Sequence, residues 1–204
     1  MKLIEQVRNI ISAESDDFFD DNTIVSHLNA GLNQVVSIAL SFERRSKNSL
    51  RVLDSLRKNV TGAVSKTETE GIYIGTVNKP SFKEIQNITV NNVRVRELTT
   101  NHLSELYYGN SKPTSEEYFY HVTPTTITIY TDNPNNQTVV IKGIGLPVPV
   151  KTFTEELADV SLRPLTDAIL YMAAHRLIMQ ETVRENATVA FKQEAMEQIE
   201  LNMY

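Results

Sequence analysis

The sequence predicts an α+β fold: a helical platform from the N- and C-terminal helices, with an inserted antiparallel β-rich region. Apolar side chains recur at helical spacing over residues 3–11 and 24–39, and again from Leu165 to Leu177. Between these stretches the apolar period changes to the alternation that is typical of strands. Helices from opposite ends of a chain can bury their apolar stripes by packing together, so we expect the middle of the chain to be an insertion.

These patterns divide the chain into three segments. We expect the N-terminal helices of the platform over residues 1–58, a β-rich lobe over 59–152, and a long C-terminal helix with a terminal tail over 153–204. A chain of 204 residues buries about 70% of its extended surface. The protein therefore has enough residues for a substantial core.

An acidic link at residues 15–23 separates the first two predicted helices. Its last residues can cap the second helix and complement its positive end. The link lacks the central glycine and the regular spacing of oxygen ligands that a calcium loop requires, so capping is the preferred interpretation. After a polar break at 43–47, a shorter helix is expected from Leu50 to Leu56.

Short strands are expected through the middle region, because β-branched and aromatic residues alternate with polar ones there. The predicted strands are 71–75, 85–90, 93–98, 118–122, 126–130 and 138–142. Asn91-Asn92 indicates a hairpin turn, and residues 101–108 indicate a short helix. We expect an antiparallel meander that glycines and prolines at 143–149 lead back to the platform.

The final stretch, from Pro164 to about residue 202, is predicted to be helical, with a possible break near Asn186. Its end is apolar and aromatic, whereas chain ends are usually polar. We therefore predict an interface with a partner surface, formed by Phe191, Met196, Ile199, Leu201, Met203 and Tyr204. Packing of this strip within its own subunit is the alternative that the sequence leaves open.

Composition limits the classes of function. The net charge is -5 and the pI is about 5.4, which argues against tight wrapping of duplex DNA but is compatible with its transient, non-specific passage. The chain has no cysteine, so disulfides and thiolate zinc sites are excluded, as in many proteins of a reducing cytoplasm. Charged residues follow within the first five positions, so we expect neither a signal peptide nor a membrane span.

The motifs of common enzymes are missing. The histidines, His27, His102, His121 and His175, fall in different predicted elements, and no pair has ligand spacing. The Gly143-Ile144-Gly145 stretch lacks the third glycine and the following helix of a dinucleotide loop. We therefore expect no metal and no cofactor.

Paired acids at 116–117 and 155–156 raise the alternative of a glycoside hydrolase, which needs two carboxyl groups across one bond. Neighbours on a strand point to opposite faces, so solvated acids are the preferred interpretation and the protein is not expected to be an enzyme. Arg94 and Arg96 share a face of the predicted strand 93–98. They are candidates for a wet groove or a channel wall, although two arginines also form an ordinary exposed stripe.

Several short motifs occur in a fixed order along the chain. Residues 22–29 read Asn-Thr-Ile-Val-Ser-His-Leu-Asn, residues 120–124 read Tyr-His-Val-Thr-Pro, and residues 127–130 read Ile-Thr-Ile-Tyr. Arg-Pro-Leu at 163–165 and Ala-Ala at 173–174 follow. In this order the sequence resembles a phage head-to-tail connector of the podoviral adaptor, or tail accessory ring, type.

The resemblance implies a homo-oligomeric ring, often a dodecamer, that docks beneath the portal protein and contacts the next tail or neck ring. DNA would pass through its channel, and the protein would lie in the neck of the virion after synthesis in the host cytoplasm. The resemblance carries no catalytic centre, no cofactor and no membrane partner. The alternatives are another phage tail or neck structural protein, a virion glycan hydrolase, and a monomeric module that binds through a sheet edge.

Overall fold

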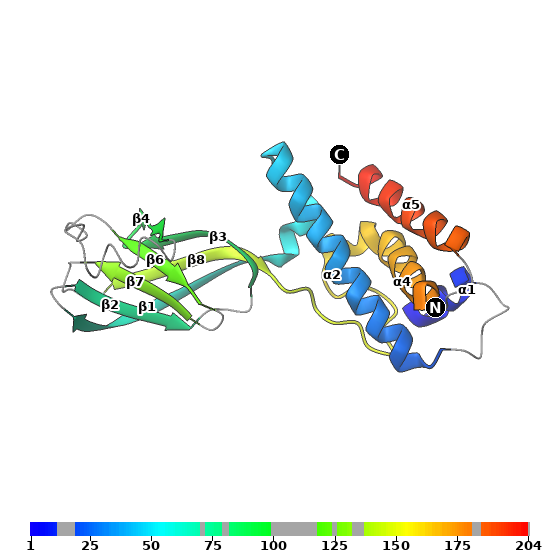
Figure 1. Cartoon of the computed structure of the whole chain (residues 1–204), viewed down its shortest axis with the longest axis horizontal. Coiled ribbons are helices and arrows are strands. Elements are labelled where there is room, and N and C mark those ends of the chain that lie inside the picture. Colours follow the sequence, from blue (N-terminus) through cyan, green and yellow to red (C-terminus); the bar gives the residue numbers. More distant parts are fainter. Residues whose placement is uncertain are drawn as a thin grey trace. The chain divides into compact units, whose positions relative to one another are not determined.

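The computed structural model describes residues 1–11, 19–69, 72–78, 82–98, 118–123, 126–131, 137–180 and 185–203. The chain forms two compact units. The helical unit comprises Met1–Leu56 and Leu146–Tyr204, and the β unit comprises Arg57–Gly145. This α+β organisation, with helices on both sides of a β region in the sequence, is the predicted fold class (Figure 1).

Six elements make up the described part of the helical unit. They are α1 (Leu3–Ile11), α2 (Asp21–Ser46), the 3-10 helix η1 (Arg51–Leu56), the 3-10 helix η2 (Val160–Leu165), α4 (Thr166–Gln180) and α5 (Glu185–Leu201). Helices α1, α2 and α5 all pack against α4 (Figure 1). Helix α4 is therefore the centre of the unit, and its residues Ala168, Met172, Ala173 and Leu177 are fully buried.

Helix α2 begins at the predicted acidic link. The Asp20 carboxylate accepts a hydrogen bond from the Thr23 backbone N–H at 2.6 Å, and this bond lowers the pKa of Asp20. The capping interpretation is confirmed at this position. The helix ends at Ser46, and the left-handed backbone of the cap residue Lys47 (φ 59°) brings its N–H to the Glu43 carbonyl.

The predicted C-terminal helical stretch is present as two helices, and the second begins next to Asn186, where the sequence indicated a possible break. Helix α4 ends at Gln180 and α5 begins at Glu185, and α5 packs back against α4. Residues 153–159 are not helical. The shorter helix predicted from Leu50 to Leu56 is present as the 3-10 helix η1.

The segment that follows the β unit belongs to the helical unit. The Asn29 side chain of α2 accepts a hydrogen bond from the Val150 N–H at 2.7 Å and donates one to the Val150 carbonyl at 3.0 Å. The Thr154 carbonyl accepts the N–H of Leu3 at the start of α1. These bonds explain why the helical unit resumes after Gly145 and not after residue 152, where the sequence pattern predicted the boundary.

The β unit contains eight described strands. They are β1 (Arg57–Thr69), β2 (Ile72–Asn78), β3 (Phe82–Val90), β4 (Val93–Arg94), β5 (Arg96–Glu97), β6 (Phe119–Val122), β7 (Thr126–Thr131) and β8 (Gln137–Gly145). Their order is β4-β3-β8-β1-β2-β7-β6-β5, and β5 and β6 are parallel while the other pairs are antiparallel. The predicted meander is therefore wrong, because β8 returns to lie between β3 and β1. The helix predicted at 101–108 lies outside the described residues.

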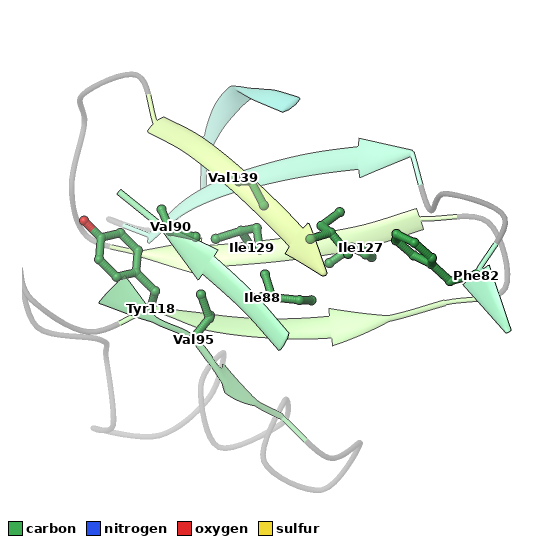
Figure 2. Packing of buried hydrophobic residues seen from close by; sticks show 9 residues of the cluster. Phe82, Ile88, Val90, Val95, Tyr118, Ile127, Ile129 and Val139 are labelled. Atoms are coloured by element: carbon green, nitrogen blue, oxygen red, sulfur yellow. The ribbon is translucent and has the colours of Figure 1, made fainter. Parts of the chain in front are cut away.

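Strand β1 holds the two halves of the sheet together. It pairs with β8 over residues 57–64 and with β2 over residues 65–69. Apolar side chains from both halves meet in one core (Figure 2). This core comprises Phe82, Ile88, Val90, Val95, Tyr118, Ile127, Ile129, Val139 and Ile141.

The predicted hairpin at Asn91-Asn92 is confirmed. Both residues have positive φ angles, 48° and 68°, as a type I′ turn requires. The turn connects β3 to β4, and the Asn91 side chain accepts a hydrogen bond from the Thr138 N–H. Among the described residues, no helix combines the length and the apolar character that crossing a membrane requires.

Candidate functional site

An open groove of about 630 Å³ lies on the β unit, between β3, residues 94–97 and β6. The polar side chains that line it are Gln86, Asn87, Arg94, Arg96, Glu97 and Tyr120. Arg94, Arg96 and Glu97 are exposed, and Asn87 and Tyr120 are half-buried. The sequence had singled out Arg94 and Arg96, and the structure brings both to this groove.

The groove forms where one segment changes its pairing partner. The Val95 N–H donates to the Ile88 carbonyl of β3 at 3.1 Å, while the next residue, Arg96, donates its N–H to the Tyr118 carbonyl at 3.1 Å. The predicted strand 93–98 is therefore broken at Val95 into β4 and β5. Val95 and Leu98 point into the core, and Arg94, Arg96 and Glu97 are left on the outer surface.

A bulge in β3 supplies the opposite side of the groove. The register between β3 and β8 shifts between Ile85 and Asn87, so Gln86 is an extra residue. Bulges redirect side chains out of the regular alternation. Here two adjacent residues, Gln86 and Asn87, both line the groove.

Hydrogen bonds orient the groove's side chains. The Tyr120 hydroxyl donates to Glu97 Oε2 at 3.4 Å, and the Arg57 guanidinium donates to Gln86 Oε1 at 3.4 Å. Burial raises the pKa of Tyr120, the charge and hydrogen bond of Glu97 raise it further, and Arg94 opposes the shift. Tyr120 is therefore a hydrogen-bond donor at neutral pH.

Asn87 is the unusual member of the set. Its Oδ1 atom is buried and has no hydrogen-bond partner within the described structure. Buried polar atoms are nearly always paired, so this acceptor is an exception among the described residues that line the groove. The sequence did not indicate Gln86, Asn87 or Glu97 as site residues, and Tyr120 was noted only as the first residue of the motif at 120–124. The bulge and the change of pairing partner that gather these residues leave no periodic signal.

The described residues of the predicted C-terminal interface differ in how far they are buried. Ile199 is fully buried within the helical unit, and the ring of Phe191 stacks on Tyr171 of α4 with centroids 6.3 Å apart. Met196 and Met203 are half-buried, and Tyr204 lies outside the described residues. Leu201 is 74% exposed, which makes it the residue of this strip that is most available to a partner.

The structure describes only some of the residues that the sequence analysis weighed for catalysis. His102 and residues 116–117 lie outside the described part of the chain, and Glu155 and Glu156 are exposed. Glu156 forms a surface ion pair with Arg163 at 2.9 Å. Among the described residues, no three acids or histidines lie close enough together to hold a metal ion.

No protein-family model matches the chain, and no curated protein matches it.

Proposed function

We propose that the protein is a structural component of a phage particle, a head-to-tail connector that forms a homo-oligomeric ring beneath the portal and encloses part of the DNA channel. The observation that carries this proposal is the architecture of the helical unit. Both ends of the chain combine in one compact platform, with the β unit inserted between Leu56 and Leu146. In the ring, neighbouring subunits would pack side by side through their helical units.

The exposed apolar residues support contacts between copies of this unit. Of the large hydrophobic residues that the described chain exposes, all but Val93 belong to the helical unit. They are Met1, Leu146, Val148, Phe153, Val160, Met179, Val189 and Leu201. Exposed apolar residues that gather on one unit are typical of interaction surfaces, and a closed ring needs two complementary ones on each subunit.

The motifs behind the resemblance have identifiable structural roles. Asn29, at the end of the motif at 22–29, anchors the segment that leaves the β unit. The Arg-Pro-Leu motif forms the end of η2, and Leu165 is buried. Ala173 and Ala174 are buried on α4, where Ala173 lies against Gly31 of α2. These three motifs therefore correspond to packing positions of the platform, whereas the motifs at 120–124 and 127–130 belong to the β unit.

In this proposal the portal and the next neck ring are the partners, and Leu201 at the end of α5 is the leading contact for the portal. Arg94 and Arg96 are exposed on the β unit and are the candidates for the channel wall. The net negative charge of the chain, -5, would limit adhesion of DNA to such a wall. The protein acts as an assembly component without catalysis.

The test is the mass of the full-length protein, alone and with the purified portal of the same particle. We expect a closed ring on the portal, because contacts around a cyclic template close on themselves, and the resemblance implies a dodecamer. An electron-microscope image of the complex would show the ring in projection. A protein that stays monomeric on an equimolar portal would contradict the proposal.

A further inference from the structure

We propose that copies of this chain contact each other through two different surfaces of the helical unit, the C-terminal end of α2 in one copy and the outer face of α5 in the next. The first surface, here called the basic end, is formed by Arg45, Lys47 and Arg51. The second, here called the acidic face, is formed by Glu194, Glu197 and Glu200. The inference rests on the proposed ring and adds to it the surfaces that join neighbouring subunits.

The basic end concentrates positive charge that the described chain does not neutralise. Four basic residues fall within residues 44–51 of a chain whose net charge is -5. Arg45, Lys47 and Arg51 are exposed, and none of them forms an ion pair within the described part of the chain. Basic residues in a last helical turn complement the helix dipole. Arg51 lies beyond the end of α2, so the dipole does not account for the whole cluster.

The acidic face is the side of α5 that points away from α4. Helix α5 packs against α4, and its residues Ala195 and Ile199 are fully buried. Glu197 and Glu200 are exposed and Glu194 is half-buried, and these three carboxylates form no ion pair with any described residue. The last turn of α5 contains no basic residue, although the C-terminal end of a helix favours cations. A cationic surface from another subunit would therefore be favourable here.

The two surfaces lie on different sides of the helical unit. Helices α2 and α5 both pack against α4, and Figure 1 shows them on either side of it, with their C-terminal ends toward the same end of the unit. Residues 168–170 and 172–174 of α4 are all buried, as expected for a helix that is covered on more than one side. A contact between two different surfaces repeats from copy to copy, and it closes into a ring where the rotation permits.

A second copy is the occupant that the charges favour. A nucleic acid would match the basic end but would be repelled by the acidic face, and a basic partner would match only the acidic face. A second copy matches both surfaces, because each copy supplies the charge that the other surface lacks. Single surface ion pairs contribute little, so the charges select which surfaces meet. Apolar area is present beside both, from the exposed Val189 on α5 and from Phe42, which lies 4.9 Å beneath the Arg45 guanidinium.

The experiment reverses the charges of each surface in the full-length protein. The basic-end variant is Arg45→Glu/Lys47→Glu/Arg51→Glu, and the acidic-face variant is Glu194→Lys/Glu197→Lys/Glu200→Lys. Sedimentation velocity measures the association of each protein at low and high salt, alone and with the purified portal. We expect association of the wild type to weaken as the salt concentration rises. Each variant should associate at least about tenfold more weakly, because like charges then meet.

An equimolar mixture of the two variants should recover the association. Each α2 end in the mixture can then meet an α5 face of opposite charge on the other variant. The matched control Arg94→Glu/Arg96→Glu/Lys142→Glu reverses three exposed charges on the β unit and should associate as the wild type does. Thermal melting monitors the fold of every sample. The acidic-face variant places lysines at a helix C-terminus, where they are favourable, so it tests the contact without weakening the helix.

Three results would overturn the inference. They are equal association of the acidic-face variant and the wild type, a mixture that associates no better than its components, and a wild type that stays monomeric both alone and with the portal. A ring on the portal that both variants still form would contradict this contact and leave the proposed function intact. Recovery in the mixture without any assembly on the portal would support the contact and contradict the proposed function.

Discussion

Gly143 and Gly145 stand two residues apart on β8, and a side chain at each would meet different surroundings. A Cβ atom at Gly143 would clash with the backbone carbonyl of Glu84 in the bulged part of β3. A Cβ atom at Gly145 would meet the side chain of Lys58, which can move aside. The first glycine is therefore required by the backbone of the neighbouring strand, and the second is replaceable.

We predict that Gly143→Ala destabilises the β unit by about 1 to 3 kcal/mol, the usual cost of overpacking. Gly145→Ala is the matched control and should change the stability much less. Urea unfolding followed by circular dichroism measures both. Equal losses in the two variants would show that the contact with Glu84 does not constrain this strand.

Asn29 is a second residue whose role depends on a distant part of the chain. Replacing it by alanine leaves both the N–H and the carbonyl of Val150 without their partner. Asn29→Ala should therefore cost about 1 to 3 kcal/mol of unfolding free energy. Asn33→Ala is the control, because Asn33 is exposed and donates to a carbonyl of its own helix. Similar thermal melting of the two variants would contradict the proposed anchoring role of Asn29.

At the scale of elements, the crossing of α2 and α4 depends on a small residue. A Cβ atom at Gly31 would lie 3.1 Å from the Ile169 carbonyl oxygen and 3.2 Å from the Ala173 nitrogen. Both contacts are backbone atoms of α4 and cannot rotate away. We predict that Gly31→Leu destabilises the helical unit by at least about 2 kcal/mol through overpacking. The exposed position Ser26 on the same helix provides the control Ser26→Leu, and equal thermal melting of the two variants would exclude a close crossing at Gly31.

Helix α5 has one buried and one exposed apolar residue close to its end. Ile199→Ala removes a fully buried side chain and should cost about 2 to 5 kcal/mol. Leu201→Ala removes an exposed one and should leave thermal melting unchanged while weakening attachment to the portal. Measuring both stability and portal affinity separates the two roles. Unchanged affinity in Leu201→Ala would remove this residue from the proposed interface.

Some helices and strands could be predicted from local sequence patterns, and others could not. Amphipathic stripes predicted α1, α2 and α4, and the asparagine pair predicted the hairpin before β4, because each of these signals is local. The 13-residue strand β1 was missed: most of its residues are polar, with three Thr and two Lys. Its place is set by pairing with β8 and β2. In the groove, Arg94 and Arg96 had a recognisable spacing, whereas Asn87 and Tyr120 reach it only through the tertiary pairing of their strands.

At the scale of the whole molecule, the β unit enters and leaves the helical unit at neighbouring points. Arg57, its first residue, pairs with Ile144 next to its last. Each unit also has its own core, from helices in one case and from β3, β7 and β8 in the other. Domain insertions are tolerated where the two connections lie close together, so the β unit can be removed without stretching the helical chain.

We therefore predict that a variant with residues 57–145 replaced by a short Gly-Ser linker folds as a helical protein. The variant should also retain ring formation on the portal, since the exposed apolar residues of the helical unit remain. Circular dichroism, thermal melting and the mass of the portal complex measure these outcomes. The isolated segment 57–145 is the complementary sample and should fold without the platform. A deletion variant that folds but no longer assembles would place the subunit contacts in the β unit, and one that does not fold would show that the two units stabilise each other.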